Sequence, residues 1–510
     1  METVIVGVGA LSFEEVVAVA RAGARVELDT GSRAAMAESR AIIEELASDD
    51  NPHYGISTGF GALAKTSIPA ELRAQLQRSL IRSHAAGSGS EVEGEVVRAL
   101  MLLRLSTLAT GRTGVRPVVA ETYAAMLNAG ITPVVLEYGS LGCSGDLAPL
   151  SHCALAALGE GTVRDAAGNL IGADIALAAS GIAPLVLREK EGLALINGTD
   201  GMLGMLVLAI HDLRALISTA DLAAALSVEG LTGTDAVFAA DLHALRPHPG
   251  QRDSAANMRR VLAGSPMLTR REGFTRVQDP YSLRCAPQVH GAVRDTIDHA
   301  ATVAGRELAS AIDNPVVTID GRVESNGNFH GAPIGYVLDF LAIAVADLAS
   351  MSERRTDRFL DSSRSHGLPP FLADDPGVDS GHMIAQYTQA GIVSELKRLA
   401  VPASVDSIPS SAMQEDHVSL GWHAARKLRR SIDGLSRVIA IELLTSTRAM
   451  DLRAPVLPGP VGVAVVAHMR SRVDGPGTDR YLAAEIAAAH ELVVDGSLLA
   501  AATEAGGVLA

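Results

Sequence analysis

The chain has 510 residues, enough for two or three domains and for a large core that needs no disulfide or metal support. Apolar residues make up 48% and charged residues 20%, which excludes wholesale disorder, and the 3% of aromatic residues favours closely packed aliphatic helices. The formal net charge of −15 disfavours nucleic-acid binding, because an acidic surface repels phosphate backbones.

The sequence predicts neither a signal peptide nor a membrane span. The N-terminal segment lacks a basic region and reaches its first acidic pair at Glu14. The most apolar stretch, 202–226, is interrupted by polar residues that include Asp212 and Arg214. The three cysteines show no CxxC spacing, which fits a reducing compartment. We therefore expect a cytoplasmic protein with no membrane partner.

The first part of the chain is predicted to combine short helices with glycine-rich loops. Leucines recur at three- and four-residue spacing over 71–83 and 92–108, which indicates two helices. Glycine-rich loops are expected at 54–61, 111–116 and 138–146. Loops of this kind on a helical scaffold are typical places for functional residues.

From residue 201 onward the pattern changes to long helices that are apolar on most faces. A hairpin is expected over 316–324, turning at Asp320-Gly321. Such helices predict a central bundle that also packs against partner subunits. The helical patterns longer than four turns cover 202–229, 287–312, 336–355, 383–400 and 416–448.

These patterns predict a mainly α fold with two domains. The first domain, 1–200, is expected to mix short elements and to carry the functional loops. The second, 201–510, is expected to be the long-helix bundle, ending in a small helical tail from about residue 455, where prolines interrupt the pattern.

Two familiar catalytic patterns are disfavoured. Residues 55–59 fit the G-x-S-x-G pattern of hydrolases, but that fold needs alternating strands and helices, which the sequence lacks. His417 and His423 are six residues apart, not the three or four that place two metal ligands on one helical face. We therefore expect neither a hydrolase nor a metal site.

The loop 138–146 has an unusual chemical option. Ser144 lies between Cys143 and Gly145, and an unhindered glycine nitrogen can attack the carbonyl two residues back to close a five-membered ring. Loss of water from the serine then leaves an exocyclic methylidene. The alternative is an ordinary glycine-rich turn before a helix, with Asp146 as its N-cap.

This loop and six further segments resemble, in order and spacing, the histidine/phenylalanine/tyrosine ammonia-lyase family. The resemblance covers about residues 1–450. Ser83-His84 and the run 414–417 resemble the branch of the family that acts on histidine, in its actinobacterial type. The matching segments are YGSLGCSGDLAPLSH (138–152), YGISTGFG (54–61), RSHAAG (82–87), EGLALINGT (191–199), QDPYSLRCAPQ (278–288), SNGNFHG (325–331) and QEDHVS (414–419).

The resemblance implies an ammonia-lyase/fumarase-like helical architecture and a homotetramer with shared active sites. It also implies non-oxidative deamination of L-histidine to trans-urocanate and ammonia, the first step of histidine degradation. The electrophile would be 4-methylidene-imidazol-5-one, formed autocatalytically from Cys143, Ser144 and Gly145, with no external cofactor and no metal. Most members have alanine where this chain has Cys143, but the ring uses only the backbone of that residue.

The resemblance further assigns catalytic roles to Tyr54 and Tyr281, in addition to Ser144, and a substrate-binding role to Arg284. Tyr281 matches the base that removes the β-proton, and Tyr54 matches the tyrosine of a mobile loop that completes the site. Arg284, three residues after Tyr281, can bind the substrate carboxylate with two hydrogen bonds, and it faces Tyr281 if both share a helix face. The sequence does not decide whether the substrate's amine or its imidazole attacks the electrophile.

The remaining matches concern substrate and cofactor binding. Asn197 and Gln278 match residues that hold the cofactor oxygen or the substrate, and Phe329 matches an aromatic contact near the ring. His84 and Glu415 match the pair that recognises imidazole.

The rival hypothesis is a tyrosine or phenylalanine ammonia-lyase or aminomutase, which places an amide at the position of Glu415.

Three positions of this chain depart from the common pattern of the family, and His290 has no assigned role. The three are Asp200, Ala286 and Met413.

Overall fold

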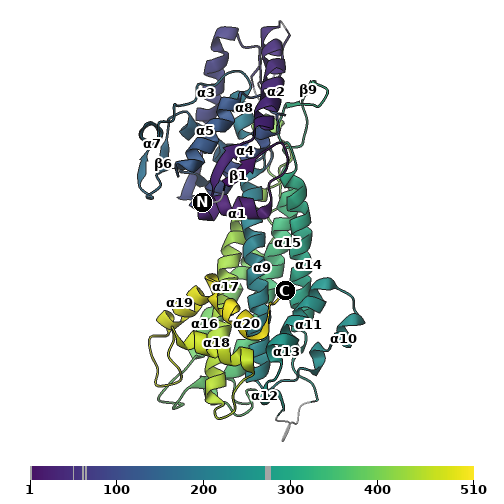
Figure 1. The fold of residues 1–510 in the computed structure, drawn as a ribbon, viewed down its shortest axis with the longest axis vertical. Coiled ribbons are helices and arrows are strands. Elements are labelled where there is room, and N and C mark those ends of the chain that lie inside the picture. The colour runs from purple at the N-terminus through teal and green to yellow at the C-terminus, as the bar shows by residue number, and fades with distance from the viewer. Residues whose placement is uncertain (1–2, 50, 60–62, 64–65, 270–276) are drawn as a thin grey trace. The chain divides into compact units, whose positions relative to one another are not determined.

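The structure, a computed structural model, describes residues 3–49, 51–59, 63, 66–269 and 277–510. It is mainly α-helical, with only short strands, and this confirms the predicted fold class (Figure 1). The chain divides into two compact units, each assembled from three segments. Unit 1 comprises Met1–His211, Ala301–Asp339 and Pro402–Arg426, and unit 2 comprises Asp212–Ala300, Phe340–Val401 and Lys427–Ala510.

The two units interleave along the sequence. Four long helices each begin in one unit and end in the other: α9 (Asp200–Gly230), α14 (Ala286–Leu308), α15 (Ala332–Leu360) and α17 (Gly421–Leu452). The compact units do not follow the order of the sequence, since the chain re-enters unit 1 at Ala301–Asp339 and again at Pro402–Arg426. The division into consecutive domains 1–200 and 201–510 stays a prediction.

Unit 1 opens with a small parallel β-pair that the sequence patterns did not indicate. Strand β1 (Thr3–Val6) pairs with β2 (Arg25–Leu28), and both bury every second residue. Helix α1 (Phe13–Ala22) connects them. It starts at a capping box formed by Ser12 and Glu15, in which each side chain bonds the backbone N–H of the other residue.

The elements that position the functional loop are also in unit 1. Strand β3 (Ser88–Glu91) pairs antiparallel with β5 (Leu136–Tyr138), and β5 leads into the loop 139–146 and then helix α6 (Leu147–Ala157). Helices α3 (Arg73–His84) and α4 (Gly94–Ala109) confirm two predicted helices.

The other elements are mostly helical. The further helices are α2 (Thr30–Ser48), α5 (Pro117–Asn128), α7 (Ala173–Ala179), α8 (Glu191–Ile196), α10 (Ala240–Ala244), α11 (Pro249–Leu262), α12 (Pro266–Thr269), α13 (Tyr281–Arg284), α16 (Met383–Leu399), α18 (Pro460–Arg470), α19 (Leu482–Val494) and α20 (Ser497–Gly506). The further strands are β4 (Thr132–Pro133), β6 (Thr162–Arg164), β7 (Leu170–Gly172), β8 (Val316–Val317) and β9 (Val323–Glu324). Strands β8 and β9 form the predicted hairpin.

One predicted helix begins later than expected. The pattern indicated a helix from residue 416, but α17 begins at Gly421. The preceding residues instead reach the functional loop, since the Leu420 N–H donates to the Leu141 carbonyl at 2.9 Å and Ser419 Oγ donates to the Gly142 carbonyl at 2.9 Å. These tertiary hydrogen bonds override the local helical pattern.

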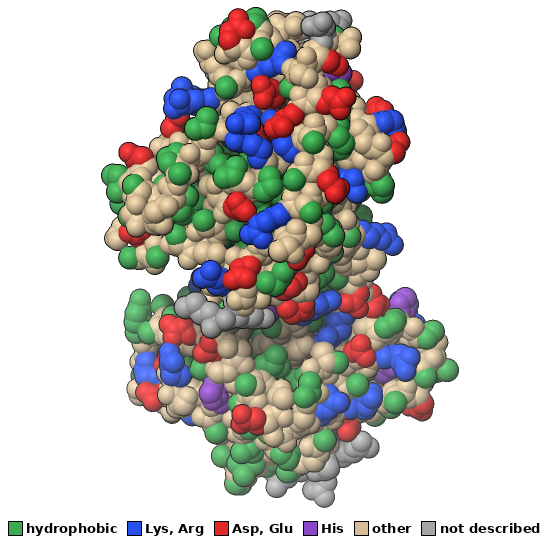
Figure 2. Space-filling model, turned by 45° about the horizontal axis from the view of Figure 1, so that its top comes forward, with side chains coloured by type: hydrophobic (Ala, Val, Ile, Leu, Met, Phe, Trp, Pro, Cys, Tyr) green, Lys and Arg blue, Asp and Glu red, His purple; other side chains and the backbone are tan. Residues whose placement is uncertain are grey.

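Helices α9 and α15 are long and apolar enough to cross a membrane by length and composition alone. However, 78% and 61% of their most apolar windows are buried inside the protein, as core helices of a bundle would be. The prediction that no membrane is involved is not tested by this observation. On the face shown in Figure 2, basic and acidic side chains are interspersed rather than gathered by sign.

Unit 2 contains a buried polar network between its long helices. Glu442 of α17 accepts hydrogen bonds from the Arg355 guanidinium, with Nε 2.5 Å from Oε1. Ser227 and Ser352 donate to the same carboxylate at 2.6 Å. His290, unassigned from the sequence, lies in this unit with its Nδ1 2.8 Å from Asp221 Oδ1, and both side chains are fully buried.

Candidate active site

Unit 1 contains a cavity of about 630 Å³ that several predicted residues line together. Tyr54, His84 and Ser144 line it, as do Asn197 and Glu415. These five residues come from four separate matching segments and the functional loop, and the fold brings them to one place. The cavity is the candidate active site.

The backbone of the functional loop leaves no room for a side chain at position 145. Gly145 has φ +77°, and a Cβ atom on it would lie 1.9 Å from the carbonyl oxygen of Gly198. The next residue, Asp146, donates its N–H to that same oxygen at 2.7 Å. Position 145 therefore has to be glycine, and its nitrogen carries no neighbouring side chain that would hinder attack.

Asp146 anchors the loop from inside the protein. Its carboxylate accepts hydrogen bonds from Ser140 Oγ and from the Met202 N–H, both at 2.9 Å. Asp146 stands at the N-cap position of α6, as the alternative predicted, but its side chain makes no capping hydrogen bond to that helix. Burial raises the pKa of Asp146 to about 7, so this carboxyl can gain or lose a proton near neutral pH.

Glu415 contacts the functional loop directly. Cys143 Sγ donates to Glu415 Oε2 at 3.0 Å, and Ser144 Oγ donates to Oε1 at 3.4 Å. Ser410 Oγ also donates to Oε2 at 3.0 Å. The backbones of Ser410 and Glu415 are joined by two further hydrogen bonds. Three successive residues between them, 411–413, adopt left-handed backbone angles, an unfavourable conformation that the surrounding contacts must hold in place.

His84, the last residue of α3, has its imidazole hydrogen-bonded to the backbone of its own helix. Its Nδ1 lies 2.9 Å from the Leu80 carbonyl oxygen, which only accepts, so Nδ1 carries the proton. Burial lowers the pKa of His84, although the Leu80 hydrogen bond and the Glu415 charge oppose this shift. When the ring is neutral, Nε2 is its hydrogen-bond acceptor.

Asn197 follows the last residue of α8 and is fixed on both sides. Its Nδ2 donates to the Asn314 carbonyl at 2.9 Å, and its own carbonyl accepts from Arg104 Nη1 at 2.7 Å. Arg104 is fully buried and also donates to the Ile312 carbonyl at 3.0 Å. The cavity wall at Asn197 therefore depends on a buried cation in α4.

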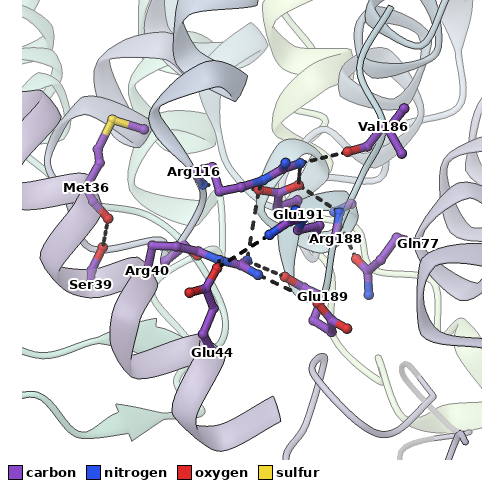
Figure 3. A network of polar contacts seen from close by, with 12 residues as sticks. Met36, Ser39, Arg40, Glu44, Gln77, Arg116, Val186, Arg188, Glu189 and Glu191 are labelled. Carbon is purple, nitrogen blue, oxygen red and sulfur yellow. Dashed lines mark hydrogen bonds and ion pairs between the residues drawn. The ribbon is translucent and has the colours of Figure 1, made fainter. Parts of the chain in front are cut away.

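The start of α8 is held by a network of charged groups, shown in Figure 3. Glu191 is fully buried and accepts two hydrogen bonds from the Arg116 guanidinium, both at 2.7 Å. The backbone N–H groups of Arg116 and Arg188 donate to it at 3.1 and 2.8 Å, and the Arg40 guanidinium lies 3.9 Å away. This network fixes the helix that ends at Asn197.

Glu191→Ala is expected to lower the free energy of unfolding by about 3–5 kcal/mol, because it leaves the partly buried Arg116 without its carboxylate. Denaturant unfolding followed by circular dichroism measures the change. The matched control is Glu189→Ala, since Glu189 is more exposed and lies 3.6 Å from Arg40. It is expected to cost less than about 1 kcal/mol. Equal losses in the two variants would contradict the role given to Glu191.

Three predicted residues, Gln278, Tyr281 and Arg284, lie in unit 2 and do not line the cavity. Tyr281 and Arg284 form the single turn α13, and the Arg284 guanidinium carbon lies 4.7 Å from the centre of the Tyr281 ring, as the shared helix face predicted. The Tyr281 side chain is 70% exposed. It is therefore free to contact another molecule.

Phe329 belongs to unit 1 but does not line the cavity. It is half-buried. Its segment nevertheless contacts the functional loop, since the Gly331 N–H donates to the Gly142 carbonyl at 3.1 Å.

Sequence reasoning missed Ser410, Asn314 and Arg104. Arg104 carried a signal, because a single cation interrupts an otherwise apolar stretch of α4. Ser410 and Asn314 carried none. Among the described residues, no group of three or more His, Cys, Asp or Glu side chains is arranged to hold a metal ion.

The fold and the cavity define a helical protein in which the serine of a glycine-rich loop lines one cavity together with His84 and Glu415. A family profile described as aromatic amino acid lyase matches residues 11–471, and the chain belongs to this family. It is 65% identical to a histidine ammonia-lyase of Streptomyces griseus and 48% identical to one of Symbiobacterium thermophilum, in each case over the whole of both chains.

Solved structures agree with this assignment. A histidine ammonia-lyase from Trypanosoma cruzi aligns with a TM-score of 0.91 at 37% identity, over 99% of this chain and 95% of that one. A tyrosine aminomutase from Streptomyces globisporus aligns with a TM-score of 0.95 at 38% identity, over the whole of both chains. The fold is thus shared by relatives that are named for different amino acids.

Proposed function

We propose that the chain is a carbon–nitrogen lyase that deaminates L-histidine to trans-urocanate and ammonia. The observation that carries this proposal is that Glu415 and His84 line the same cavity as Ser144. The relatives at 64–65% identity are histidine ammonia-lyases, which supports the same substrate.

The proposed electrophile is 4-methylidene-imidazol-5-one, formed from Cys143, Ser144 and Gly145 without an external cofactor. The residues fit this group, because position 145 excludes any side chain and Asp146 fixes the end of the loop. Once formed, the group supplies an electron sink that makes ammonia a better leaving group. Asp146, with its raised pKa, can move a proton during ring closure.

Substrate selection follows from the acceptors in the cavity. The Glu415 carboxylate can accept a hydrogen bond from an imidazole N–H, which a phenyl ring cannot donate. His84, which lines the same cavity, is proposed to make a second polar contact with the imidazole of the substrate. Asn197 and Tyr54, which also line the cavity, are proposed to hold the cofactor oxygen and to complete the site.

The residues of α13 and its neighbourhood are proposed to act in a neighbouring subunit of a cytoplasmic homotetramer. Tyr281 removes the β-proton, Arg284 binds the carboxylate of the substrate, and Gln278 holds the substrate or the cofactor. The exposure of Tyr281 supports this arrangement, since a base must reach the substrate. Phe329 is proposed to contact the ring from its segment beside the functional loop.

The first test is near-UV absorbance of the purified protein with L-histidine, L-tyrosine and L-phenylalanine in separate reactions. Each conjugated product absorbs where its substrate does not. A rise with histidine alone is expected. A rise with either aromatic substrate instead would favour the tyrosine or phenylalanine enzyme, and no rise with any of them would contradict lyase activity.

Glu415→Gln is expected to lower kcat/KM for histidine at least about 100-fold, because an amide that donates toward the imidazole N–H leaves that group unpaired. Steady-state kinetics on the purified variant measure the loss. Glu395→Gln, on an exposed face of α16, is the matched control and should keep the wild-type value. An unchanged rate in Glu415→Gln would count against histidine as the substrate.

A further inference from the structure

The Glu415 carboxylate has two oxygens with different partners. Oε2 accepts two hydrogen bonds, from Cys143 Sγ and Ser410 Oγ, both at 3.0 Å. Oε1 accepts one longer hydrogen bond, from Ser144 Oγ at 3.4 Å. The two oxygens are therefore held unequally, and the shorter contacts are all on one side.

Cofactor formation affects only one of these contacts. Ring closure joins the Gly145 nitrogen to the Cys143 carbonyl carbon, whose oxygen leaves as one water with the Gly145 and Ser144 amide hydrogens, and Ser144 loses its hydroxyl and its Cα hydrogen as a second water. The Cys143 side chain and Ser410 take no part in these bond changes. Oε1 consequently loses its partner, while the two donors to Oε2 remain.

We infer that the Cys143 thiol and the Ser410 hydroxyl are positioning residues that fix Glu415 through Oε2 and leave Oε1 for the imidazole N–H of the substrate. The inference rests on the proposed function and adds a specificity role for the side chain of a residue whose backbone alone enters the ring.

The surroundings of Cys143 suit a permanent donor. The side chain is 6% exposed and packs in an apolar cluster with Val418 and Leu420. Burial and the adjacent Glu415 raise the pKa of the thiol to about 12, so the sulfur keeps its proton at every working pH. A thiolate at this position would instead repel the carboxylate.

The backbone around Ser410 supports the same role. Ser410 and Glu415 exchange two backbone hydrogen bonds, at 2.9 and 3.3 Å, so the hydroxyl is carried next to the carboxylate that it contacts. One donor thus comes from the functional loop and the other from Glu415's own turn. Together the Cys143 thiol and the Ser410 hydroxyl fix Glu415, the proposed specificity residue, relative to the cofactor-forming loop.

The test compares Cys143→Ala with Cys143→Ser, which have similar sizes but differ in the donor. Cys143→Ala is expected to raise KM for histidine about three- to tenfold, with kcat within about twofold of wild type. Cys143→Ser is expected to restore KM to within about twofold. If the thiol only fills space, the two variants should behave alike, and this result would overturn the inference.

A second readout separates imidazole recognition from general damage. The inhibition constant of urocanate, which carries an imidazole, should rise in Cys143→Ala by the same factor as KM. The inhibition constant of cinnamate, which carries a phenyl ring, should not change. Cys153→Ala removes a buried thiol of α6 that no hydrogen bond among the described residues joins to a carboxylate, and it should leave both constants unchanged. A parallel rise for cinnamate would also overturn the inference.

Ser410→Ala gives an independent variant if Cys143→Ala does not fold, and it should raise KM in the same range. If Ser410→Ala kept the wild-type KM, the positioning role inferred for the Ser410 hydroxyl would be overturned. Intact-mass measurement shows whether each variant has lost its two waters. If the Cys143→Ala chain kept its unmodified mass, the thiol would be needed for cofactor formation, and this result would overturn the positioning role. Failure of the proposed function is seen separately, as a wild-type chain that releases no urocanate from histidine.

Discussion

Ser144→Ala should abolish histidine turnover, by at least about a thousandfold, and should leave the chain at its full unmodified mass. Alanine has no hydroxyl to lose, so the exocyclic methylidene cannot form. The wild-type chain should be lighter than its sequence mass by two waters, about 36 Da, the balance of the proposed condensation. Intact-mass spectrometry and the urocanate assay measure the two effects on the same sample.

Substitution of Gly145 should abolish histidine turnover as well. In Gly145→Ala the new methyl group would meet the Gly198 carbonyl oxygen, since an ideal Cβ lies 1.9 Å from it, and the loop could not keep its conformation. The control is Ser151→Ala, whose hydroxyl donates only to the Leu147 carbonyl within α6, and it should keep both activity and the mass deficit. A Ser144→Ala chain with wild-type turnover would refute the proposed electrophile.

The sequence predicted elements well where a local periodicity coincided with burial. The helices over 71–83 and 92–108 and the hairpin at 316–324 were found within a few residues of their bounds. The start of α17 was misplaced because Ser419 and Leu420 bond to the functional loop, and no local pattern encodes a partner so far away in the sequence. The short parallel pair β1–β2 was missed for the same reason.

The site was predictable as a set of residues but not as a geometry. Motif matches indicated His84, Glu415 and Ser144, and the fold places all three around one cavity. The hydrogen bonds of the Glu415 carboxylate could not be predicted, since they depend on the left-handed turn 411–413. That turn contains no glycine, the residue type that usually indicates left-handed backbone in a sequence. Asp146 also differs, because its side chain faces the interior instead of capping α6.

The second large effect concerns chains that are inactive alone but active together. Tyr281→Phe removes the proposed base and should lower kcat by about 100- to 10,000-fold. Ser144 lines the cavity of unit 1, whereas Tyr281 is exposed in unit 2. If each site takes Ser144 from one subunit and Tyr281 from another, mixed oligomers of the two variants regain intact sites.

Co-expression of Ser144→Ala and Tyr281→Phe chains with different affinity tags, followed by tandem purification, tests this arrangement. In a random mixture about one quarter of sites would combine an intact Ser144 with an intact Tyr281, so about a quarter of wild-type activity is expected. Wild-type chains co-expressed with Ser144→Ala chains are the reference, and their mixed oligomers should keep about one half of wild-type activity. If both groups had to come from one chain, the mixed oligomers would be as inactive as the single variants, because neither chain carries both. Recovery therefore distinguishes a site shared between subunits from a site within one chain, and it does so without any change to the residues that bind histidine.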